Sequence, residues 1–226
     1  DRGNIDVNGT VVVPVDEVAI GYWLKAMFGA PETDGDGDPY THVFTPGDTQ
    51  PSLVLEQGFT DIGVYEKFNG CKISRFSISF GGDAPLRANI DIMGAKETIS
   101  ATSLDADPTE IDLVKYNQFH GAIQEGGATV GNITGFDLTI EFNLDGDQYT
   151  IGSGGARSDI PEGILAVTGT IRAFFENATL LNKAIEGTES SIRMTLANGQ
   201  NRSLEFYLPE VMYERNSPGI EGSRGI

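Results

Sequence analysis

Carboxylates alternate with other residues in one acidic loop, and this pattern is the closest approach to a metal site in the sequence. Asp34, Asp36 and Asp38 have the spacing of the first ligands of an EF-hand, which binds calcium through carboxylate oxygens. The sixth position of that loop must be glycine and the twelfth glutamate, whereas this sequence has Pro39 and Thr45 there. The EF-hand interpretation therefore fails, and an irregular calcium site and a solvated acidic loop remain as alternatives.

Histidine and cysteine, the residues that most often serve as metal ligands or activated nucleophiles, are scarce. His42 and His120 are the only histidines, and neither has a metal-ligand spacing or a neighbouring nucleophile motif. His42 falls in a predicted strand, which favours a structural role. Cys71 is the single cysteine, so no disulfide can form within the chain, and this indicates assembly in a reducing compartment such as a cytoplasm.

Pairs of carboxylates are the remaining candidates for catalysis. Asp91 with Glu97, and Asp137 with Glu141, have the residue types that glycosidases use as general acid and base. Such pairs are common on any acidic sheet, and Trp23 is the single tryptophan that could stack on a sugar ring. We therefore predict a protein that is not an enzyme and that needs no cofactor.

The charge balance excludes a second class of function. The chain has 226 residues, a formal net charge of -18 and a sequence pI near 4.3. Nucleic-acid-binding proteins gain affinity when Lys and Arg release counterions from the polyanion, so specific DNA or RNA binding is not expected. No run approaches the roughly 18 apolar residues needed to span a bilayer, and no secretion signal opens the sequence, so we expect no membrane contact.

The spacing of apolar residues predicts two amphipathic helices. The first lies near residues 17–29, where Asp16 is placed to cap the amino end and Gly29 to end the helix. Its inward face consists of Ile20, Trp23, Leu24, Met27 and Phe28. The second lies near residues 178–186 and ends at Gly187. Its inward face consists of Leu180, Leu181, Ala184 and Ile185.

Alternation of apolar and polar residues predicts antiparallel strands over much of the rest. The clearest strand covers residues 136–144, in which Asp137 and Glu141 fall on the polar face. Further strands are expected at residues 11–15, 40–44, 52–56, 72–80, 87–93, 121–124, 165–175, 191–196 and 203–208. Pairs of Asn-Gly or Asp-Gly are typical of tight turns, and we expect them at Asn8-Gly9, Asn69-Gly70 and Asp145-Gly146.

These elements predict a mainly β protein, an antiparallel β-sandwich or barrel with one or two short flanking helices. The order strand, helix, glycine, strand occurs in residues 10–55 and again in residues 170–196, which is the pattern of an internal duplication. On that interpretation, residues 1–130 form a first β module and residues 131–226 a second. The alternative is that both pack as one continuous domain.

Most of the chain is also similar to a known family. The runs that carry the similarity are residues 23–30 (WLKAMFGA), 41–44 (THVF), 52–56 (SLVLE), 69–73 (NGCKI), 208–211 (LPEV) and 218–220 (PGI). With the strand that continues to Gly94, they resemble the major tail tube proteins of long-tailed bacteriophages. The family continues past a segment like residues 217–226 into another strand, so we expect a truncated terminus.

The resemblance implies that copies of the chain form rings, that the rings stack into a conduit for DNA in the virion tail, and that assembly occurs in the host cytoplasm. It also implies contact with tape measure and tail-end proteins. We expect Asp137 and Glu141 to line an acidic lumen that repels DNA, and three chains per ring if the chain is duplicated or six if it is not. The alternative is a standalone β-sandwich binding module or adhesin, with calcium bound in the acidic loop.

Overall fold

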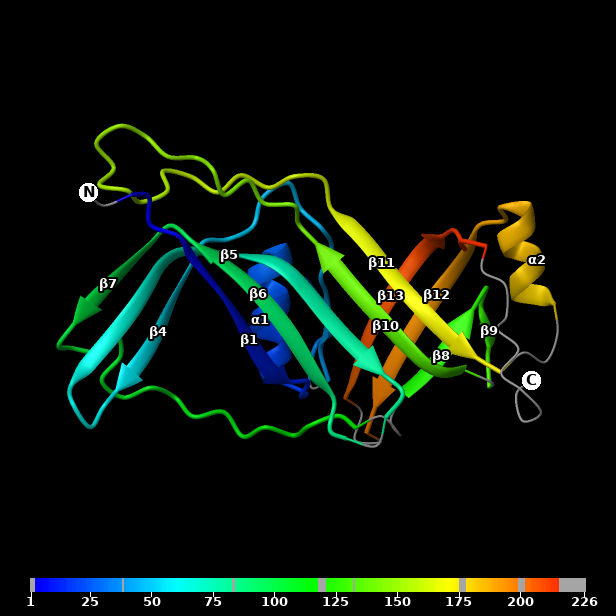
Figure 1. Cartoon of the computed structure of the whole chain (residues 1–226). Helices are drawn as coiled ribbons and strands as arrows, with labels where there is room; N and C mark the ends of the chain where they lie inside the picture. The colour runs from blue at the N-terminus through cyan, green and yellow to red at the C-terminus, as the bar shows by residue number, and fades with distance from the viewer. Residues whose placement is uncertain are drawn as a thin grey trace, which may run out of the picture. The chain divides into compact units, whose positions relative to one another are not determined.

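A mainly β structure with two short helices accounts for the described part of the chain, which confirms the predicted fold class (Figure 1). The computed structural model describes residues 3–37, 39–82, 84–117, 121–131, 133–174, 178–198 and 202–215. The helices are α1 (Ala19–Phe28) and α2 (Thr179–Glu186). The strands are β1 (Val7–Pro14), β2 (Glu32–Asp34), β3 (Thr41–Val43), β4 (Leu53–Phe59), β5 (Val64–Phe80), β6 (Arg87–Gly94), β7 (Lys96–Ser100), β8 (Gly121–Glu125), β9 (Ala128–Thr129), β10 (Ile133–Glu141), β11 (Ala166–Ala173), β12 (Ser190–Ala197) and β13 (Ser203–Val211).

The strands form three sheets. The largest has seven strands, with the order β1-β6-β5-β10-β11, and β4 and β7 also pair with β5. The second has the order β13-β12-β8-β9, and β2 pairs with β3 in the third. Neighbouring strands such as β1 and β6, or β12 and β13, run antiparallel. Within the described residues, none of these sheets closes into a barrel, so β1 and β11 are edge strands of the largest sheet.

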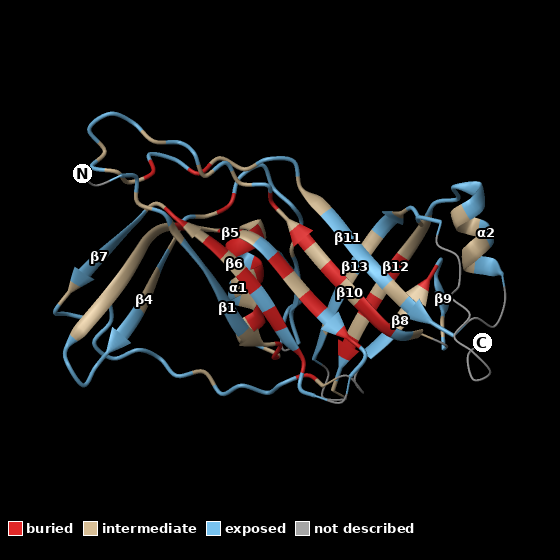
Figure 2. Cartoon of the chain, in the orientation of Figure 1, coloured by how far each residue is buried: buried red, intermediate tan, exposed pale blue. Residues whose placement is uncertain are grey.

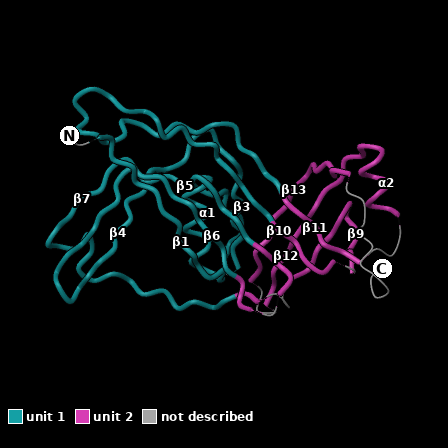
Figure 3. Tube along the Cα trace, in the orientation of Figure 1, with its two compact units in different colours: residues 1–78, 87–115, 138–168 teal, residues 79–86, 116–137, 169–226 magenta. Residues whose placement is uncertain are grey.

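The chain divides into two compact units, coloured separately in Figure 3. Unit 1 comprises residues 1–78, 87–115 and 138–168, and unit 2 comprises residues 79–86, 116–137 and 169–226. Three of the boundaries fall inside strands β5, β10 and β11, and the other two lie just before β6 and in the loop between residues 115 and 116. This division does not test whether the chain is duplicated, so modules at residues 1–130 and 131–226 stay a prediction.

Helix α1 contributes its apolar stripe to the core of unit 1. Ile20, Leu24 and Met27 are buried, as expected from positions four and three residues apart on one helix face. The Phe28 ring lies 5.9 Å from the ring of Phe142. Strands β5 and β6 contribute alternate buried residues to the same unit (Figure 2), among them Ile73, Phe76, Ile78, Ala88 and Ile90.

The predicted end of α1 at Gly29 is confirmed, whereas the helix begins at Ala19 and Val18 occupies the N-cap position expected for Asp16. The Asp16 carboxylate accepts hydrogen bonds from the backbone N–H groups of Val18 and Ala19, at 2.8 and 2.6 Å, and so satisfies donors that the first turn leaves open. Gly29 follows the helix with φ +87°, a conformation that favours glycine. Among the described residues, no helix is long and apolar enough to cross a membrane.

Helix α2 differs from the sequence prediction in one respect. It begins and ends where expected, and Gly187 ends it with φ +64° in the left-handed conformation. None of its residues is buried, however, and Ile185 is 53% exposed. The prediction that its apolar residues face a core is therefore wrong, because amphipathic spacing indicates a face that can be covered without showing that this chain covers it.

Two predicted turns are also wrong. Asn8 and Gly9 lie inside β1, where they pair with Met93 and Ile92 of β6. Asn69 and Gly70 lie inside β5, at a register shift between the pairs formed with β4. Gly70 has φ +63° there, as in a β-bulge, and a Cβ at this position would lie 2.9 Å from the Ala95 Cβ. In both places a partner strand distant in sequence overrides the local turn preference.

Strand β10 ends at Glu141, three residues before its predicted end. Asn143 then adopts φ +47°, which an extended strand does not allow. Its carbonyl is also approached closely by Gly163, since a Cβ at residue 163 would lie 2.4 Å from the Asn143 oxygen. The turn predicted at Asp145-Gly146 is consequently absent, and the Asp145 backbone N–H instead donates a hydrogen bond to the Pro161 carbonyl at 2.9 Å.

Arg157 joins distant parts of unit 1 from a nearly buried position. Its Nε donates to the Gly146 carbonyl at 2.7 Å, and its Nη1 donates to the carbonyls of Gly94 at 2.7 Å and Val7 at 3.3 Å. Its Nη2 pairs with the exposed carboxylate of Asp6. The side chain of Arg157 is only 3% exposed, so its bonds replace those that water would otherwise supply.

We expect Arg157→Met to lower the free energy of unfolding by about 3 kcal/mol, because it leaves buried carbonyls without donors while keeping much of the side-chain volume. Urea unfolding at neutral pH measures the loss. The control is Arg193→Met, since the Arg193 side chain is 42% exposed and pairs with Glu205 on the surface. That change should cost less than about 1 kcal/mol, and equal losses in the two variants would contradict the role given to Arg157.

Candidate functional site

The polar face of the largest sheet contains an ion-paired aspartate in unit 2. Arg172 on β11 donates to both carboxylate oxygens of Asp137 on β10, at 2.5 and 3.1 Å. Ser79 on β5 donates a further hydrogen bond to the same carboxylate. The hydrogen bonds from Arg172, followed by that from Ser79, hold the pKa of Asp137 below its ordinary value, so this group is ionised at neutral pH.

A similar arrangement occurs on the part of this face that belongs to unit 1. Arg75 on β5 pairs with Asp91 on β6, with 2.7 Å between Nε and Oδ2. Thr10 on β1 donates to the other carboxylate oxygen of Asp91 at 2.6 Å. Both oxygens of Asp91 are therefore engaged by cross-strand neighbours, and nothing in this geometry presents it as a general acid with Glu97.

The alternation predicted for β10 is confirmed. Phe136, Leu138 and Ile140 are buried, whereas Asp137 and Glu141 are half-buried on the opposite face. Glu141 forms no ion pair among those of the described residues, in contrast to Asp137. The face thus combines paired and unpaired carboxylates, so its charge is less negative than the acidic residues alone would indicate. Whether these residues line a lumen stays a prediction.

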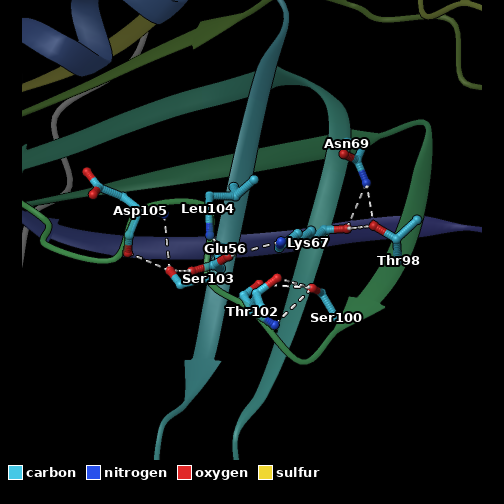
Figure 4. A network of polar contacts seen from close by, with 9 residues as sticks. All are labelled: Glu56, Lys67, Asn69, Thr98, Ser100, Thr102, Ser103, Leu104 and Asp105. Carbon is cyan, nitrogen blue, oxygen red and sulfur yellow. Dashed lines mark hydrogen bonds and ion pairs between the residues drawn. The ribbon is translucent and has the colours of Figure 1, made fainter.

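A three-stranded projection, which we call the arm, consists of β4, β7 and residues 64–71 of β5. One of its faces has a network of polar contacts, drawn in Figure 4. Glu56 on β4 accepts hydrogen bonds from the Ser103 hydroxyl at 2.6 Å and from the Leu104 backbone at 2.7 Å. Lys67 on β5 lies 3.8 Å from the Glu56 carboxylate. Glu56 therefore holds the segment that follows β7 against this face.

The same segment is ordered by its own short-range hydrogen bonds. The Ser103 hydroxyl donates to the Asp105 carbonyl at 2.8 Å, and the Asp107 backbone donates to the Asp105 carboxylate at 3.0 Å. Closer to β7, the Thr102 backbone donates to the Ser100 hydroxyl at 3.1 Å. Serine and aspartate side chains stabilise such turns by bonding to backbone groups two residues away. The segment is thus shaped locally and fixed to the arm by Glu56.

Unit 2 contains a second polar cluster, centred on Glu125 of β8. Lys183 of α2 lies 2.6 Å from the Glu125 carboxylate, the Ser190 hydroxyl donates to it at 2.5 Å, and the Tyr213 hydroxyl lies 3.3 Å away. Burial alone would raise the pKa of Glu125, but the hydrogen bonds from Lys183 and Ser190 outweigh it, so the pKa lies below the ordinary value. Because α2 has no buried residue, this ion pair is a principal attachment of the helix.

The predicted metal candidates are not brought together by the described structure. Asp34 ends β2 and accepts a hydrogen bond from the Gly35 backbone at 2.9 Å, and Asp36 is exposed. Asp38 lies outside the described residues. No group of three or more His, Cys, Asp or Glu among the described residues is arranged to hold a metal ion. The described residues thus give the calcium prediction no support. Because Asp38 is not described, the complete set of three carboxylates stays untested.

His42 and Cys71, the described candidates for acid-base or nucleophilic chemistry, are held by contacts that favour a structural role. His42 lies in β3, where its Nδ1 is 2.9 Å from the Thr33 hydroxyl of β2 and its ring stacks on Tyr40. Cys71 is buried, and burial raises the pKa of its thiol, which disfavours the reactive thiolate. Its Sγ donates to the Phe68 carbonyl at 3.3 Å. His120 lies outside the described residues.

Sequence reasoning missed the positively charged partners. Arg172, Arg75 and Lys183 each neutralise an acidic residue that is distant in sequence. Alternation identified the strands, but it gives no register between them, and the register decides which charges become neighbours. Glu56 was missed for the same reason, since its partners follow a strand that the sequence did not predict.

Comparison with known proteins identifies a family over the whole chain. A family model described as phage tail tube protein matches residues 1–226. No curated protein matches the chain. A structural protein of this family is consistent with the β-rich architecture and with the structural roles of His42 and Cys71.

We expect Glu125→Gln to lower the free energy of unfolding by about 1–3 kcal/mol at pH 7, because Lys183 then lacks a charged partner. The folded pKa of Glu125 lies below its ordinary value of 4.5, so its stabilising effect is complete above pH 4.5 and is lost as the pH falls through the folded pKa. The difference between the two proteins should therefore be constant near neutral pH and should shrink in more acidic solution. Urea unfolding from pH 7 to pH 3 measures it.

The matched control is Glu189→Gln, which changes an exposed carboxylate near the same cluster and should alter stability by less than about 0.5 kcal/mol. A Glu125→Gln effect of the same size at every pH would contradict the ionic origin of the stabilisation.

Proposed function

Since this chain belongs to the phage tail tube protein family, a structural and non-enzymatic component of the virion tail, we propose that its copies close into rings and that the rings stack into a conduit for DNA. The observation that carries this proposal is the pair of open edges of the largest sheet. An open edge presents unpaired backbone N–H and C=O groups, which a strand from another copy can satisfy. A ring lets each copy use both edges.

The composition of the edge strands supports pairing between copies. β1 contains Val11, Val12 and Val13, and the first two are 37% and 53% exposed. β11 contains Val167, which is 42% exposed. Monomeric proteins usually protect a sheet edge with lysine, proline or a bulge, because an exposed β-branched strand associates with others. Neither edge has a lysine, and the one proline of β1, Pro14, is the last residue of the strand and leaves Val11 and Val12 without such protection. On β11 the charge of Arg172 is neutralised by Asp137, so the composition of both edges favours association.

We assign the polar face with Asp137 and Glu141 to the lumen of the tube. The opposite face of β10 is apolar and buried, so only the polar face can meet solvent and DNA. On this face Arg172 and Arg75 are paired with aspartates and are not free to bind phosphate. A surface whose cations are neutralised in this way gives DNA no site for counterion release, and DNA would pass without adhering.

For the number of chains we propose three per ring, on the basis of an internal duplication. Each edge strand of the largest sheet leads into a helix, β1 into α1 and β11 into α2, and each helix is followed by a glycine with positive φ, Gly29 and Gly187. Two similar halves per chain give pseudo-sixfold symmetry with three chains. Six chains per ring would show that the halves are not equivalent.

Membership of the family supports a proposal for the partners and the place of assembly. We propose that the conduit forms in the host bacterial cytoplasm, around a tape measure protein, and that specialised proteins bind its two ends. Buried, unpaired Cys71 is compatible with a reducing compartment. No observation favours the alternative of a standalone calcium-binding adhesin.

We expect concentrated protein to form rings or stacked tubes that negative-stain electron microscopy resolves, with three chains per ring by native mass spectrometry. Assembly should increase with protein concentration, because the backbone groups of each open edge form hydrogen bonds only when another copy binds there. A protein that stays monomeric at every accessible concentration would refute the proposed function, whereas rings of six would refute only the duplication.

We expect Val12→Lys to raise the concentration required for ring formation at least about tenfold, because it puts a charge on the β1 edge. Val12 is 53% exposed in the single chain, so the fold and the unfolding midpoint should change little. Val43→Lys, at a position in β3 that is 47% exposed, is the control and should assemble normally. Sedimentation velocity over a concentration series measures both, and normal assembly of Val12→Lys would exclude the β1 edge from the interface.

A further inference from the structure

The arm has two faces of different chemistry, as its register shows. Leu55, Phe68 and Glu97 are cross-strand neighbours, and so are Gln57, Glu66 and Ile99. Successive residues of a strand point to opposite faces, so these two rows share a face with the neighbouring pair of Phe59 and Val64. We call this the apolar arm face, and its apolar members are Leu55, Phe59, Val64, Phe68 and Ile99.

The chain covers the opposite, polar face of the arm and leaves the apolar arm face open. Figure 4 shows the segment after β7 held on the polar face by Glu56. On the apolar arm face Ile99 is 69% exposed and Phe59 is 38% exposed, and none of the apolar members is buried. In a protein that acts alone, a chain segment is expected to cover the apolar side, because covering it removes apolar surface from water. The reversed arrangement indicates a surface that a partner covers.

Charge on the apolar arm face restricts the chemistry of that partner. Glu66 and Glu97 lie among the apolar residues, and neither forms an ion pair among those of the described residues. The chain has a net charge of -18, so most of the surface of a second copy would repel this face. A partner surface must therefore present apolar groups together with a cation that its own chain does not neutralise.

The outer side of α1 has this composition. Val18 and Tyr22, 41% and 65% exposed, are followed by exposed Lys25, at intervals of four and three residues that place them on one stripe. This exposed α1 stripe lies on the helix side away from buried Ile20 and Leu24. Lys25 forms no ion pair among those of the described residues. Tyrosine and lysine both combine an apolar body with a polar end, as suits a half-apolar surface.

We propose that the apolar arm face of one copy binds the exposed α1 stripe of a second copy, with Glu66 next to Lys25 and Ile99 next to Tyr22. Both surfaces belong to unit 1, and in Figure 1 the strands of the arm extend away from α1, so the contact joins separate copies. The proposal rests on the proposed function, in which copies of this chain assemble, and it adds a lateral contact of side chains to the edge pairing of β1 and β11.

A charge exchange tests this contact. Glu66→Lys and Lys25→Glu should each raise the concentration required for assembly about tenfold, because like charges then face each other. The double variant Glu66→Lys/Lys25→Glu should return to within about twofold of the wild-type concentration, since the pair is restored in reverse. Sedimentation velocity gives these concentrations, and circular dichroism with urea unfolding verifies that each variant is folded.

The controls change the same charges elsewhere. Asp36→Lys, in the exposed loop after β2, matches the charge change of Glu66→Lys, and Lys96→Glu, on the polar face of the arm, matches that of Lys25→Glu. Both controls should assemble like the wild type. If the controls weaken assembly as much as the test variants, or if the double variant is no better than the single ones, the proposed contact is wrong while ring formation by the wild type still stands.

Crosslinking gives a readout that does not depend on charge. A copy with Ile99→Cys and a tagged copy with Tyr22→Cys are mixed and assembled, and mild oxidation should join them into a heterodimer of distinct mass. The native thiol of Cys71 is buried and should not compete. Failure to form this heterodimer within tubes visible by electron microscopy would overturn the contact, whereas absence of tubes from wild-type protein would overturn the proposed function on which it rests.

Discussion

The hydrogen-bond ladder of β5 is the constraint on which the other elements depend. This 17-residue strand pairs with β6 over its second half and with β4 and β7 over its first half, and it also neighbours β10. The register shift at Asn69 and Gly70 lies between the two regions of pairing. A bulge bends a strand and increases its twist, so one continuous strand can serve both the largest sheet and the arm. The position of Gly70 thereby determines where the core ends and the arm begins.

The resulting surfaces have a common feature, which is incomplete coverage. The largest sheet has open edges, α2 has no buried residue, and the arm has an uncovered apolar face. A chain of this size can bury enough apolar surface to satisfy its own elements, and a monomer would be expected to do so. In the assembly that we propose for this member of the phage tail tube protein family, the same features are the parts of the subunit that neighbouring copies cover. Its high negative charge then limits association to contacts that supply apolar area or a matched cation.

The sequence predicted those properties that local patterns encode. The α1 stripe, the hydrogen bonds of Asp16 to the amino end of α1 and the alternation of β10 are consequences of residue spacing along one element. The turns expected at Asn8-Gly9 and Asn69-Gly70 were wrong because a distant strand supplied hydrogen bonds that local preference does not describe. Partners such as Arg172 for Asp137 depend on register between strands, which spacing within one strand leaves undetermined.

The hydrogen bonds of Arg157 to residues near the amino end have a consequence for the timing of folding. Arg157 and Asp6 are separated by 151 positions, and the same side chain also bonds to Val7 at the start of β1. During translation, at about 5–20 residues per second, the beginning of β1 emerges many seconds before the arginine that fixes it. Contacts of such high sequence separation form late, so an incomplete nascent chain lacks the bonds by which Arg157 holds the residues at the start of β1. Until then β1 is held by its pairing with β6, so the last step in fixing this edge strand waits for the chain around residue 157.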